Sequence, residues 1–452
     1  MNNNQHILDL ISSKSILNVN KKESSGQVFT PNKIIIDMIS TIPDEIWNNK
    51  NLKWLDPTSG IGNFMIIIYL KLMKNLSHYK ELKDDKIRSK HIIKNMLFMN
   101  ELDKESIETT KDLFYILDKD SIINIKNTNF LDYTTDDKYD IIVENPPYNI
   151  GGTKEKGQKN VFVFFAVKSL QLLKDNGYLL IIHPSSYRLG NYKPRGTKIN
   201  LNNIYTKYQI HNICLFTIIQ TYELMNVQIN VDYILLQKCD KYKLTLITDI
   251  YGYNHFYDIS PNITIPNFGF NIIDKIKNLC NKYGNIYDLV YRTSELHHEN
   301  WKKGKVEIGK YPIIHLLKNQ RMGHNNNILM SNIKHTHQNT PKIIINSLGV
   351  KYVFLDKEGI YGVTDSPFII LSSSQKLFNL LNSSLFNYIV NTISILGNNL
   401  NVIVFKFIPN IHDIKDDINI YNLLKLTNEE INTIEKYNCN NIQNIKMKDR
   451  KK

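Results

Sequence analysis

Short apolar runs alternate with longer amphipathic runs through the first half of the chain, and this alternation limits the folds that it can adopt. The short runs are typical of buried strands and lie at 52–56, 96–101, 122–127, 139–144 and 177–182. Between them, "FMIIIYLKLMKNL" and "VFVFFAVKSLQLLKD" are typical of helices. Alternating strands and helices predict an α/β fold with a parallel sheet, which "NICLFTII" and "VDYILLQK" could complete.

The pattern changes after about residue 245, where aromatic residues, Gly and Asn are scattered through "DIYGYNHFYDISPNITIPNFGFN". Farther on, "PKIIINSLGVKYVFLDKEGIYGVTDSPFIILSS" is typical of twisted strands with turns, and "QKLFNLLNSSLFNYIVNTI" of an amphipathic helix. We therefore expect a first domain over 1–245, a second α+β domain over 246–415 and a C-terminal tail over 416–452.

The chain is basic, with 56 Lys and Arg against 43 Asp and Glu and a net charge of +13. Such a charge suits a polyanionic partner, although the Lys, Asn and Ile usage of an A+T-rich genome would explain it equally well. Its distribution is more informative. No acidic residue occurs from Asn176 to Asn200, a stretch that contains Arg188, Lys193 and Arg195.

Neither a membrane span nor a disulfide framework is expected. No apolar run approaches the ~20 residues that cross a bilayer, and the N-terminus lacks the layout of a signal peptide. The four cysteines, Cys214, Cys239, Cys280 and Cys439, form no C-x-x-C pair. We therefore expect an intracellular, cytoplasmic protein, or one in the host cytoplasm if the source is a virus.

A glycine-rich turn follows the first strand in "WLDPTSGIGNF". The strand ends at Asp56, and a helix is expected from about Asn63. Gly60 and Gly62 remove side chains where a ligand must approach the backbone, and the N-terminus of the helix favours negative groups. A simple turn is the alternative for any single glycine pair, but the ordering D-P-x-x-G-x-G-N-F is more specific.

Polar residues also follow the next two strands. Glu101 lies where an acid can bind both ribose hydroxyls of a nucleoside cofactor, although a solvated acid is an equal alternative and Asp103 competes for the role. In "NTNFLDY", Asn129 could accept a hydrogen bond from an adenine amine, and Phe130 could pack on the ring.

The motif "NPPY" directly follows the strand at 139–144. An exocyclic amine is a poor nucleophile because its lone pair is delocalised into the ring, so its N–H groups must be held while the lone pair is localised. The side-chain carbonyl of Asn145 and the main-chain carbonyl of Pro146 can accept those hydrogen bonds, with Pro146 and Pro147 fixing the backbone. Tyr148 can stack on a base lifted out of a duplex. A proline-rich turn at a strand end is the alternative.

These motifs in this order resemble the gamma class of N6-adenine DNA methyltransferases of restriction-modification systems. The segment "GQVFTP" comes first, followed by the glycine turn, the acidic strand end, N-P-P-Y and a C-terminal target-recognition domain. The resemblance covers roughly residues 20–410 and is strong to about 190. It implies a Rossmann-like S-adenosylmethionine-dependent methyltransferase sheet, S-adenosyl-L-methionine as cofactor and double-stranded DNA as substrate.

The resemblance also implies roles for individual residues. Thr30 would contact the methionine carboxylate, Asp56 the methionine amine region and Glu101 the ribose. The implied cofactor-binding residues are Gln27, Phe29, Thr30, Pro31, Asp56, Pro57, Gly60, Gly62, Asn63, Glu101, Asn129 and Phe130. The implied catalytic residues are Asn145, Pro146, Pro147 and Tyr148. Pro31 would also begin a helix.

One departure from the family pattern stands out. Asn129 occupies a position where the family usually has the Asp that binds the cofactor adenine amine, and Asp132 lies three residues later. Because Asn can accept through its carbonyl, we still expect cofactor binding. A second aromatic wall for the target base is also expected, from Tyr222 or Phe216.

Outside these motifs, His297, His298, His335 and His337 lack the Cys partners or helical spacing of a metal site, so we expect surface positions in a DNA-facing domain and no metal. The basic segments "ENWKKGK" and "KNQRMGHNNN" could contact phosphates and base edges, or be solvated loops.

The function that we expect from the sequence is methyl transfer to adenine N6 in double-stranded DNA, as part of a restriction-modification system or derived from one. Cytosine N4, RNA and a protein glutamine amide are alternative acceptors, and an inactive DNA-binding protein with the same fold is the non-catalytic alternative. A separately encoded restriction endonuclease could be a partner, and a monomer is the default expectation.

Overall fold

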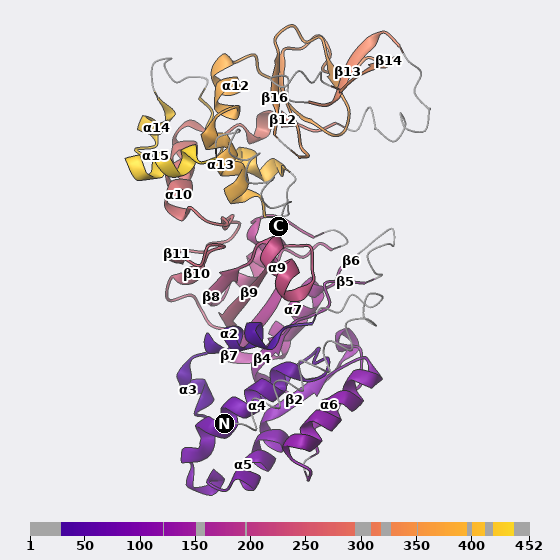
Figure 1. The fold of residues 1–452 in the computed structure, drawn as a ribbon, viewed down its shortest axis with the longest axis vertical. Helices are drawn as coiled ribbons and strands as arrows, with labels where there is room; N and C mark the ends of the chain where they lie inside the picture. Colours follow the sequence, from indigo (N-terminus) through magenta and orange to yellow (C-terminus); the bar gives the residue numbers. More distant parts are fainter. Residues whose placement is uncertain are drawn as a thin grey trace. The chain divides into compact units, whose positions relative to one another are not determined.

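The computed structural model describes residues 29–120, 122–150, 159–194, 197–293, 309–317, 327–349, 351–395, 400–411 and 419–437. The chain divides into two compact units, Met1–Ile265 and Pro266–Lys452 (Figure 1). The sequence placed the boundary after residue 245.

A nine-stranded sheet forms the centre of unit 1, in the order β11-β10-β8-β9-β7-β4-β1-β2-β3 (Figure 1). The neighbouring strands β3, β2, β1, β4 and β7 are parallel to one another. β9 runs antiparallel between β7 and β8, and β11 is antiparallel to β10. The strands are β1 (Trp54–Asp56), β2 (Leu97–Asn100), β3 (Asn124–Lys126), β4 (Tyr139–Glu144), β7 (Leu173–Pro184), β8 (Gln209–Leu215), β9 (Val231–Gln237), β10 (Thr245–Thr248) and β11 (Asn254–Tyr257).

The five strands expected from the apolar runs are all present, and the two further candidates form β8 and β9. The predicted α/β sheet is therefore confirmed. The strands β10 and β11, which follow the change in sequence pattern, extend the same sheet.

Helices in unit 1 connect successive strands of the sheet. The expected helices are observed as α4 (Asn63–Asn75) and α7 (Phe162–Leu172). In α4, Met65, Ile66 and Ile68 are fully buried in a cluster that also contains residues of α2 (Asn32–Ser40). The other main helices are α5 (Asp85–His91), α6 (Lys104–Leu117), α8 (Leu201–Tyr205) and α9 (Ile218–Met225). Within the described residues, every helix is too short or too polar to cross a membrane.

Unit 2 is a mixture of small sheets and helices. Its strands form a four-stranded sheet in the order β12-β18-β15-β16 and a three-stranded sheet in the order β14-β13-β17. Their bounds are β12 (Val290–Tyr291), β13 (Tyr311–Leu316), β14 (Asn327–Ser331), β15 (Lys342–Ile345), β16 (Val353–Asp356), β17 (Gly362–Val363) and β18 (Phe368–Ile370). The helices include α10 (Phe270–Tyr283), α12 (Gln375–Leu381), α13 (Ser384–Ile393), α14 (Ile420–Leu423) and α15 (Asn428–Glu435).

The single amphipathic helix expected near residues 375–393 is two helices. α12 ends at Leu381, and Ser383 begins α13 by accepting the backbone N–H of Phe386 at 3.3 Å. A serine side chain competes for backbone hydrogen bonds inside a helix but satisfies an unpaired N–H at its start, which explains the break.

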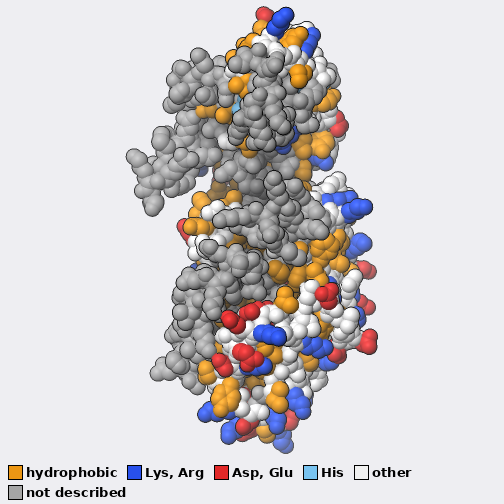
Figure 2. Space-filling model, turned by 90° about the vertical axis from the view of Figure 1, so that its right-hand side faces the viewer, with side chains coloured by type: hydrophobic (Ala, Val, Ile, Leu, Met, Phe, Trp, Pro, Cys, Tyr) orange, Lys and Arg blue, Asp and Glu red, His pale blue; other side chains and the backbone are white. Residues whose placement is uncertain are grey.

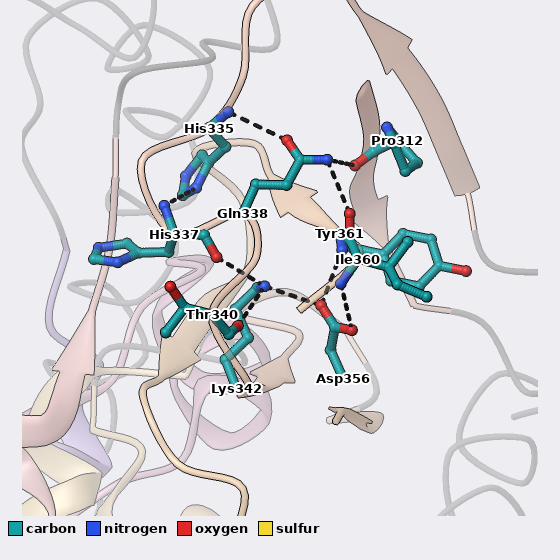
Figure 3. Close-up of polar contacts among 9 residues, drawn as sticks. All are labelled: Pro312, His335, His337, Gln338, Thr340, Lys342, Asp356, Ile360 and Tyr361. Carbon is teal, nitrogen blue, oxygen red and sulfur yellow. Dashed lines mark hydrogen bonds and ion pairs between the residues drawn. The ribbon is translucent and has the colours of Figure 1, made fainter. Parts of the chain in front are cut away.

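A buried ion pair joins two strands of unit 2 (Figure 3). The Lys342 ammonium, which is inaccessible to solvent, donates to the Asp356 carboxylate at 2.9 Å and to the main-chain oxygens of His337 and Thr340, each at 3.0 Å. Asp356 also accepts the backbone N–H groups of Ile360 and Tyr361, each at 2.9 Å. The pair therefore holds together the loops before β15 and after β16.

We predict that Lys342→Met destabilises this part of unit 2, because the substitution leaves a buried carboxylate without its counter-charge. The cost should be about 3–5 kcal/mol. Hydrogen exchange of the full chain should show faster exchange of the β15 and β16 amides. The exposed neighbour Lys357 gives the matched control, Lys357→Met, which should leave that exchange unchanged. Equal protection in both variants would contradict a stabilising role for the pair.

Candidate active site

The carboxyl ends of four neighbouring parallel strands, β3, β2, β1 and β4, lie along one edge of the sheet in unit 1. Asp56 ends β1, Glu101 follows β2, Asn129 lies three residues beyond β3, and Asn145 follows β4. Open α/β sheets bind ligands at this edge. The fold thus brings together four motifs that lie far apart in the sequence.

The glycine turn between β1 and α4 adopts the left-handed conformation that it requires, with φ of +55° at Gly60 and +84° at Gly62. A Cβ atom at Gly62 would lie 2.9 Å from the Cγ2 atom of Thr110 on α6, whereas a Cβ at Gly60 would meet no atom within 4 Å. Gly62 is thus needed for packing, and Gly60 borders open space. As expected, α4 begins at Asn63.

Two side-chain oxygens of the turn are buried without a hydrogen-bond partner among the described residues, the Oγ of Ser59 and the Oδ1 of Asn63. Leaving such atoms unsatisfied in the folded chain is costly, by about 1–3 kcal/mol each. Together with the open space at Gly60, they fit a polar ligand that approaches the backbone of the turn.

Glu101 connects the glycine turn to the end of β2. One carboxylate oxygen accepts the backbone N–H of Gly60 at 2.7 Å, and the other accepts those of Leu102 and Asp103, each at 2.8 Å. The side chain is only 4% exposed. Because a carboxylate can accept about four hydrogen bonds, Glu101 retains acceptor capacity for a ribose hydroxyl while it organises both loops.

Asp56 lies in an electrostatically unfavourable position. Burial, more than any other cause, raises the pKa of its carboxyl well above the ordinary value. The backbone N–H of Thr58, 3.1 Å away, lowers that pKa, and the nearby charges of Glu144 and Glu101 raise it further. Three buried carboxyl groups at one edge favour a positively charged ligand, which would relieve their mutual repulsion.

Asn145 is held by a residue from the start of the described chain. Its Nδ2 donates to the Oγ1 of Thr30 at 2.8 Å, which directs the side-chain carbonyl away from Thr30. Its main-chain oxygen accepts the Oγ1–H of Thr58 at 3.3 Å. The "TP" and "NPPY" motifs, 115 residues apart, therefore meet in one site beside the glycine turn. Pro31 precedes α2 as its N-cap residue.

The other residues of the "NPPY" motif are largely buried and present no exposed surface for stacking. Pro146 is buried and Pro147 half-buried. Tyr148 is only 4% exposed and packs in the main hydrophobic cluster of unit 1. Its hydroxyl is buried without a hydrogen-bond partner among the described residues, and burial raises its pKa. A base could stack on Tyr148 only after the ring is uncovered.

In the loop after β3, Phe130 is not placed as expected for a side chain that packs on a cofactor ring. The ring is 2% exposed and packs on Phe165 and Tyr133, with ring centroids at 5.7 and 6.0 Å. The side chain thus stabilises the interior rather than presenting a face to a ligand. Leu102, which follows Glu101 and is 66% exposed, is an apolar side chain at this edge that the sequence did not single out.

Glu144 is a second residue that the sequence did not single out. It ends β4, is inaccessible to solvent, and burial raises its pKa to about 8, an effect that Ser169 on α7 partly opposes. Burial raises the pKa of Tyr205 on α8, and the charge of Glu144 raises it further. An acid at the end of the apolar run "YDIIVE" was the available signal. Glu144 thus directly precedes Asn145 in the chain.

The other predicted residues differ in exposure, and some lie outside the described residues. Of the candidates for a second aromatic wall, Tyr222 on α9 is 51% exposed, and Phe216 is half-buried against Tyr233 at 5.9 Å. His335 is 1% exposed, so the expected surface position is wrong for it. Gln27, His297 and His298 lie outside the described residues. Within those residues, no three His, Cys, Asp or Glu side chains form a group that could hold a metal ion.

The strand order and the glycine turn form the Rossmann-like α/β sheet that the sequence predicts. Residues 65–220 match the model of the Eco57I restriction-modification methylase family. An uncharacterised adenine-specific methylase from Mycoplasma pneumoniae is 24% identical, over 36% of this chain and 56% of the relative. The chain therefore spans about half the length of the curated relative that it matches.

Among solved structures, the type IIL restriction-modification enzyme MmeI in complex with DNA is 12% identical with a TM-score of 0.47, over 88% of this chain and 66% of that chain. A type I restriction-modification methyltransferase subunit from Streptococcus thermophilus is 16% identical with a TM-score of 0.34, over 49% and 46%. The family match and the curated relative confirm the predicted resemblance to adenine-specific methylases of restriction-modification systems.

We predict that the two glycines of the turn respond differently to alanine. Gly62→Ala should lower the free energy of unfolding by about 1–3 kcal/mol, because the new methyl group clashes with Thr110. Gly60→Ala adds only backbone strain to the fold but places a methyl group in the open space, so it should chiefly weaken ligand binding. Thermal unfolding and equilibrium binding of S-adenosylmethionine separate the two effects.

Thr110→Ser supplies the control for the first effect, because it removes the clashing Cγ2 atom and keeps the hydroxyl. Adding Thr110→Ser to Gly62→Ala should recover part of the lost stability. If Gly60→Ala bound S-adenosylmethionine as well as the unsubstituted chain, the open space would not be part of a cofactor site.

We predict that Glu144→Gln makes the chain less sensitive to alkaline pH. The pKa of Glu144 rises from 4.5 to about 8 on folding, so between these values the folded chain binds a proton that the unfolded chain has lost. The free energy of unfolding therefore falls as pH rises through this window, by on the order of a few kcal/mol. Melting temperatures at pH 6 and pH 8.5 should converge in Glu144→Gln. Asp136→Asn, which changes an exposed carboxyl, is the control. If the melting temperature of Glu144→Gln fell between pH 6 and pH 8.5 as much as that of the unsubstituted chain, Glu144 would not be the group responsible.

Proposed function

We propose that the protein transfers a methyl group from S-adenosyl-L-methionine to N6 of adenine in double-stranded DNA, within or derived from a restriction-modification system. The observation that carries this proposal is the hydrogen bond from Asn145 to Thr30, which fixes the "NPPY" motif beside the glycine turn. The family match and the adenine-specific methylase relative support the same reaction.

The residues around the turn fit the proposed cofactor. Glu101 would accept from the ribose, and the glycine turn would approach the nucleoside. Asp56 and the neighbouring acidic groups would favour the positive charges of the sulfonium and the methionine amine. The buried oxygens of Ser59 and Asn63 would gain polar contacts. The cofactor would supply an electrophilic methyl group.

The catalytic work of the chain would be to position the target amine. The Asn145 carbonyl and the Pro146 main-chain carbonyl would each accept an N–H of the amine, which localises the nitrogen lone pair toward the methyl donor. Thr30 holds the Asn145 amide by its Nδ2, so its carbonyl is oriented before the base arrives. Pro146 and Pro147 restrict the loop, which lowers the entropy lost on binding.

DNA as the substrate is supported by the resemblance, and the net charge of +13 suits it; unit 2 would be the target-recognition domain and unit 1 the catalytic domain. On the face of unit 1 shown in Figure 2, basic and acidic side chains are interspersed. Support for DNA therefore comes from the whole chain rather than from a basic patch on this face. A separately encoded restriction endonuclease would be the expected partner.

The proposal is tested by incubating the purified chain with labelled S-adenosylmethionine and unmethylated duplex DNA, then identifying the labelled nucleoside by mass spectrometry. We expect N6-methyladenine, and a loss of at least about 100-fold in rate for Asn145→Ala, which removes a preorganised acceptor. Thr30→Val should lower the rate less, because it releases the Asn145 amide but leaves the Asn145 carbonyl in the site, and Thr30→Ser, which keeps the hydroxyl, should restore the rate.

Other outcomes would change the conclusion in defined ways. Label in N4-methylcytosine would keep the fold and change the base. Cofactor binding without label in DNA would point to RNA or a protein glutamine amide. A chain that binds no S-adenosylmethionine would be an inactive relative of the methyltransferases.

A further inference from the structure

The side-chain amide of Asn129 is held at both ends by its own loop. Its Oδ1 accepts the backbone N–H of Leu131 at 3.1 Å, and its Nδ2 donates to the Oδ2 of Asp132 at 2.8 Å. These two contacts require opposite ends of the amide, so they fix its orientation. An aspartate here would have a second acceptor oxygen, whereas Asn129 has an NH2 group, which would repel another amine.

Asp132 supplies a carboxylate beside the Asn129 amide. Its carboxylate is exposed and within hydrogen-bond distance of Asn129, and the contact with Asn129 uses one of its two oxygens. Ionised carboxylates are acceptors only, with about four lone-pair sites. Asp132 therefore has the chemistry to bind an exocyclic amine, and Asn129 holds it in place from the side.

The loop that carries both residues is attached to the proposed ribose site. The Nδ2 of Asn127 donates to the main-chain oxygens of Glu101 and Leu102 at 2.9 and 2.8 Å. The backbone N–H of Glu101 donates to the main-chain oxygen of Lys126 at 3.0 Å. On the other side, the Lys168 ammonium donates to the main-chain oxygen of Leu131 at 2.7 Å. The loop that carries Asn129 and Asp132 is therefore fixed beside the proposed ribose site.

We propose that Asp132, not Asn129, accepts the 6-amino group of the cofactor adenine, and that Asn129 is a positioning residue for Asp132. The proposal rests on the proposed use of S-adenosylmethionine, and it assigns the selectivity for adenine to a residue in the turn after Asn129. It replaces the expectation that the Asn129 carbonyl binds this amine.

The test compares equilibrium binding of S-adenosylhomocysteine with that of S-inosylhomocysteine, in which a 6-oxo group replaces the 6-amino group. The full chain should prefer the amino compound by about 10- to 100-fold, because the oxo group would face a carboxylate. Asp132→Asn can donate to the oxo group, so the preference should fall to near one or reverse. Asp136→Asn, at another exposed carboxyl of the same segment, should keep the full preference.

Asn129→Asp distinguishes the two assignments. If Asp132 binds the amine, the substitution places a second carboxylate against it and should weaken binding of S-adenosylhomocysteine. Tighter binding by Asn129→Asp, or an unchanged preference in Asp132→Asn with a native melting temperature, would overturn the proposal while leaving the proposed function intact. If the unsubstituted chain bound neither compound, both the proposed function and this inference would fail.

Discussion

The carboxylate of Glu101 is the contact on which the rest of the candidate site depends. It accepts three backbone N–H groups, one from the glycine turn and two from its own loop. Hydrogen bonds to a charged acceptor contribute about 1.5–3 kcal/mol each. Glu101 thereby fixes the distance between the ends of β1 and β2. Because Asn127 donates to the Glu101 and Leu102 carbonyls, the end of β3 is fixed to the same point.

The same edge of the sheet concentrates buried acids. Burial raises the pKa of Asp56 and of Glu144, and each additional carboxylate nearby opposes ionisation of Asp56. Such an arrangement costs stability in the folded chain unless a ligand compensates for it. A sulfonium cofactor with a protonated amine brings two positive charges, so its binding would be coupled to ionisation of these groups. The destabilised edge is thus consistent with a binding site rather than a structural core.

Much of the first unit was predictable because central strands such as β1 and β4 are buried on both faces and therefore appear as continuous apolar runs. The polar residues that end those runs, Asp56, Glu101 and Asn145, were predictable for the same reason. Continuation of the sheet through β10 and β11 was not predictable, because β10 alternates buried with half-buried residues and the edge strand β11 is mostly exposed. Neither was the division between α12 and α13, which depends on one Ser cap within an apolar pattern.

Side-chain direction was the least predictable property of the site. Position in a motif places a residue at the edge of the sheet, but packing decides which way it faces. Phe130 turns into the interior against Phe165, and Tyr148 packs within the main cluster. The hydroxyl of Tyr148 is nevertheless buried without a partner among the described residues, a cost that an apolar Phe at this position would avoid. Stability alone therefore does not explain a tyrosine here, whereas the proposed stacking on a target base would explain it, because the uncovered hydroxyl would then be solvated or hydrogen-bonded.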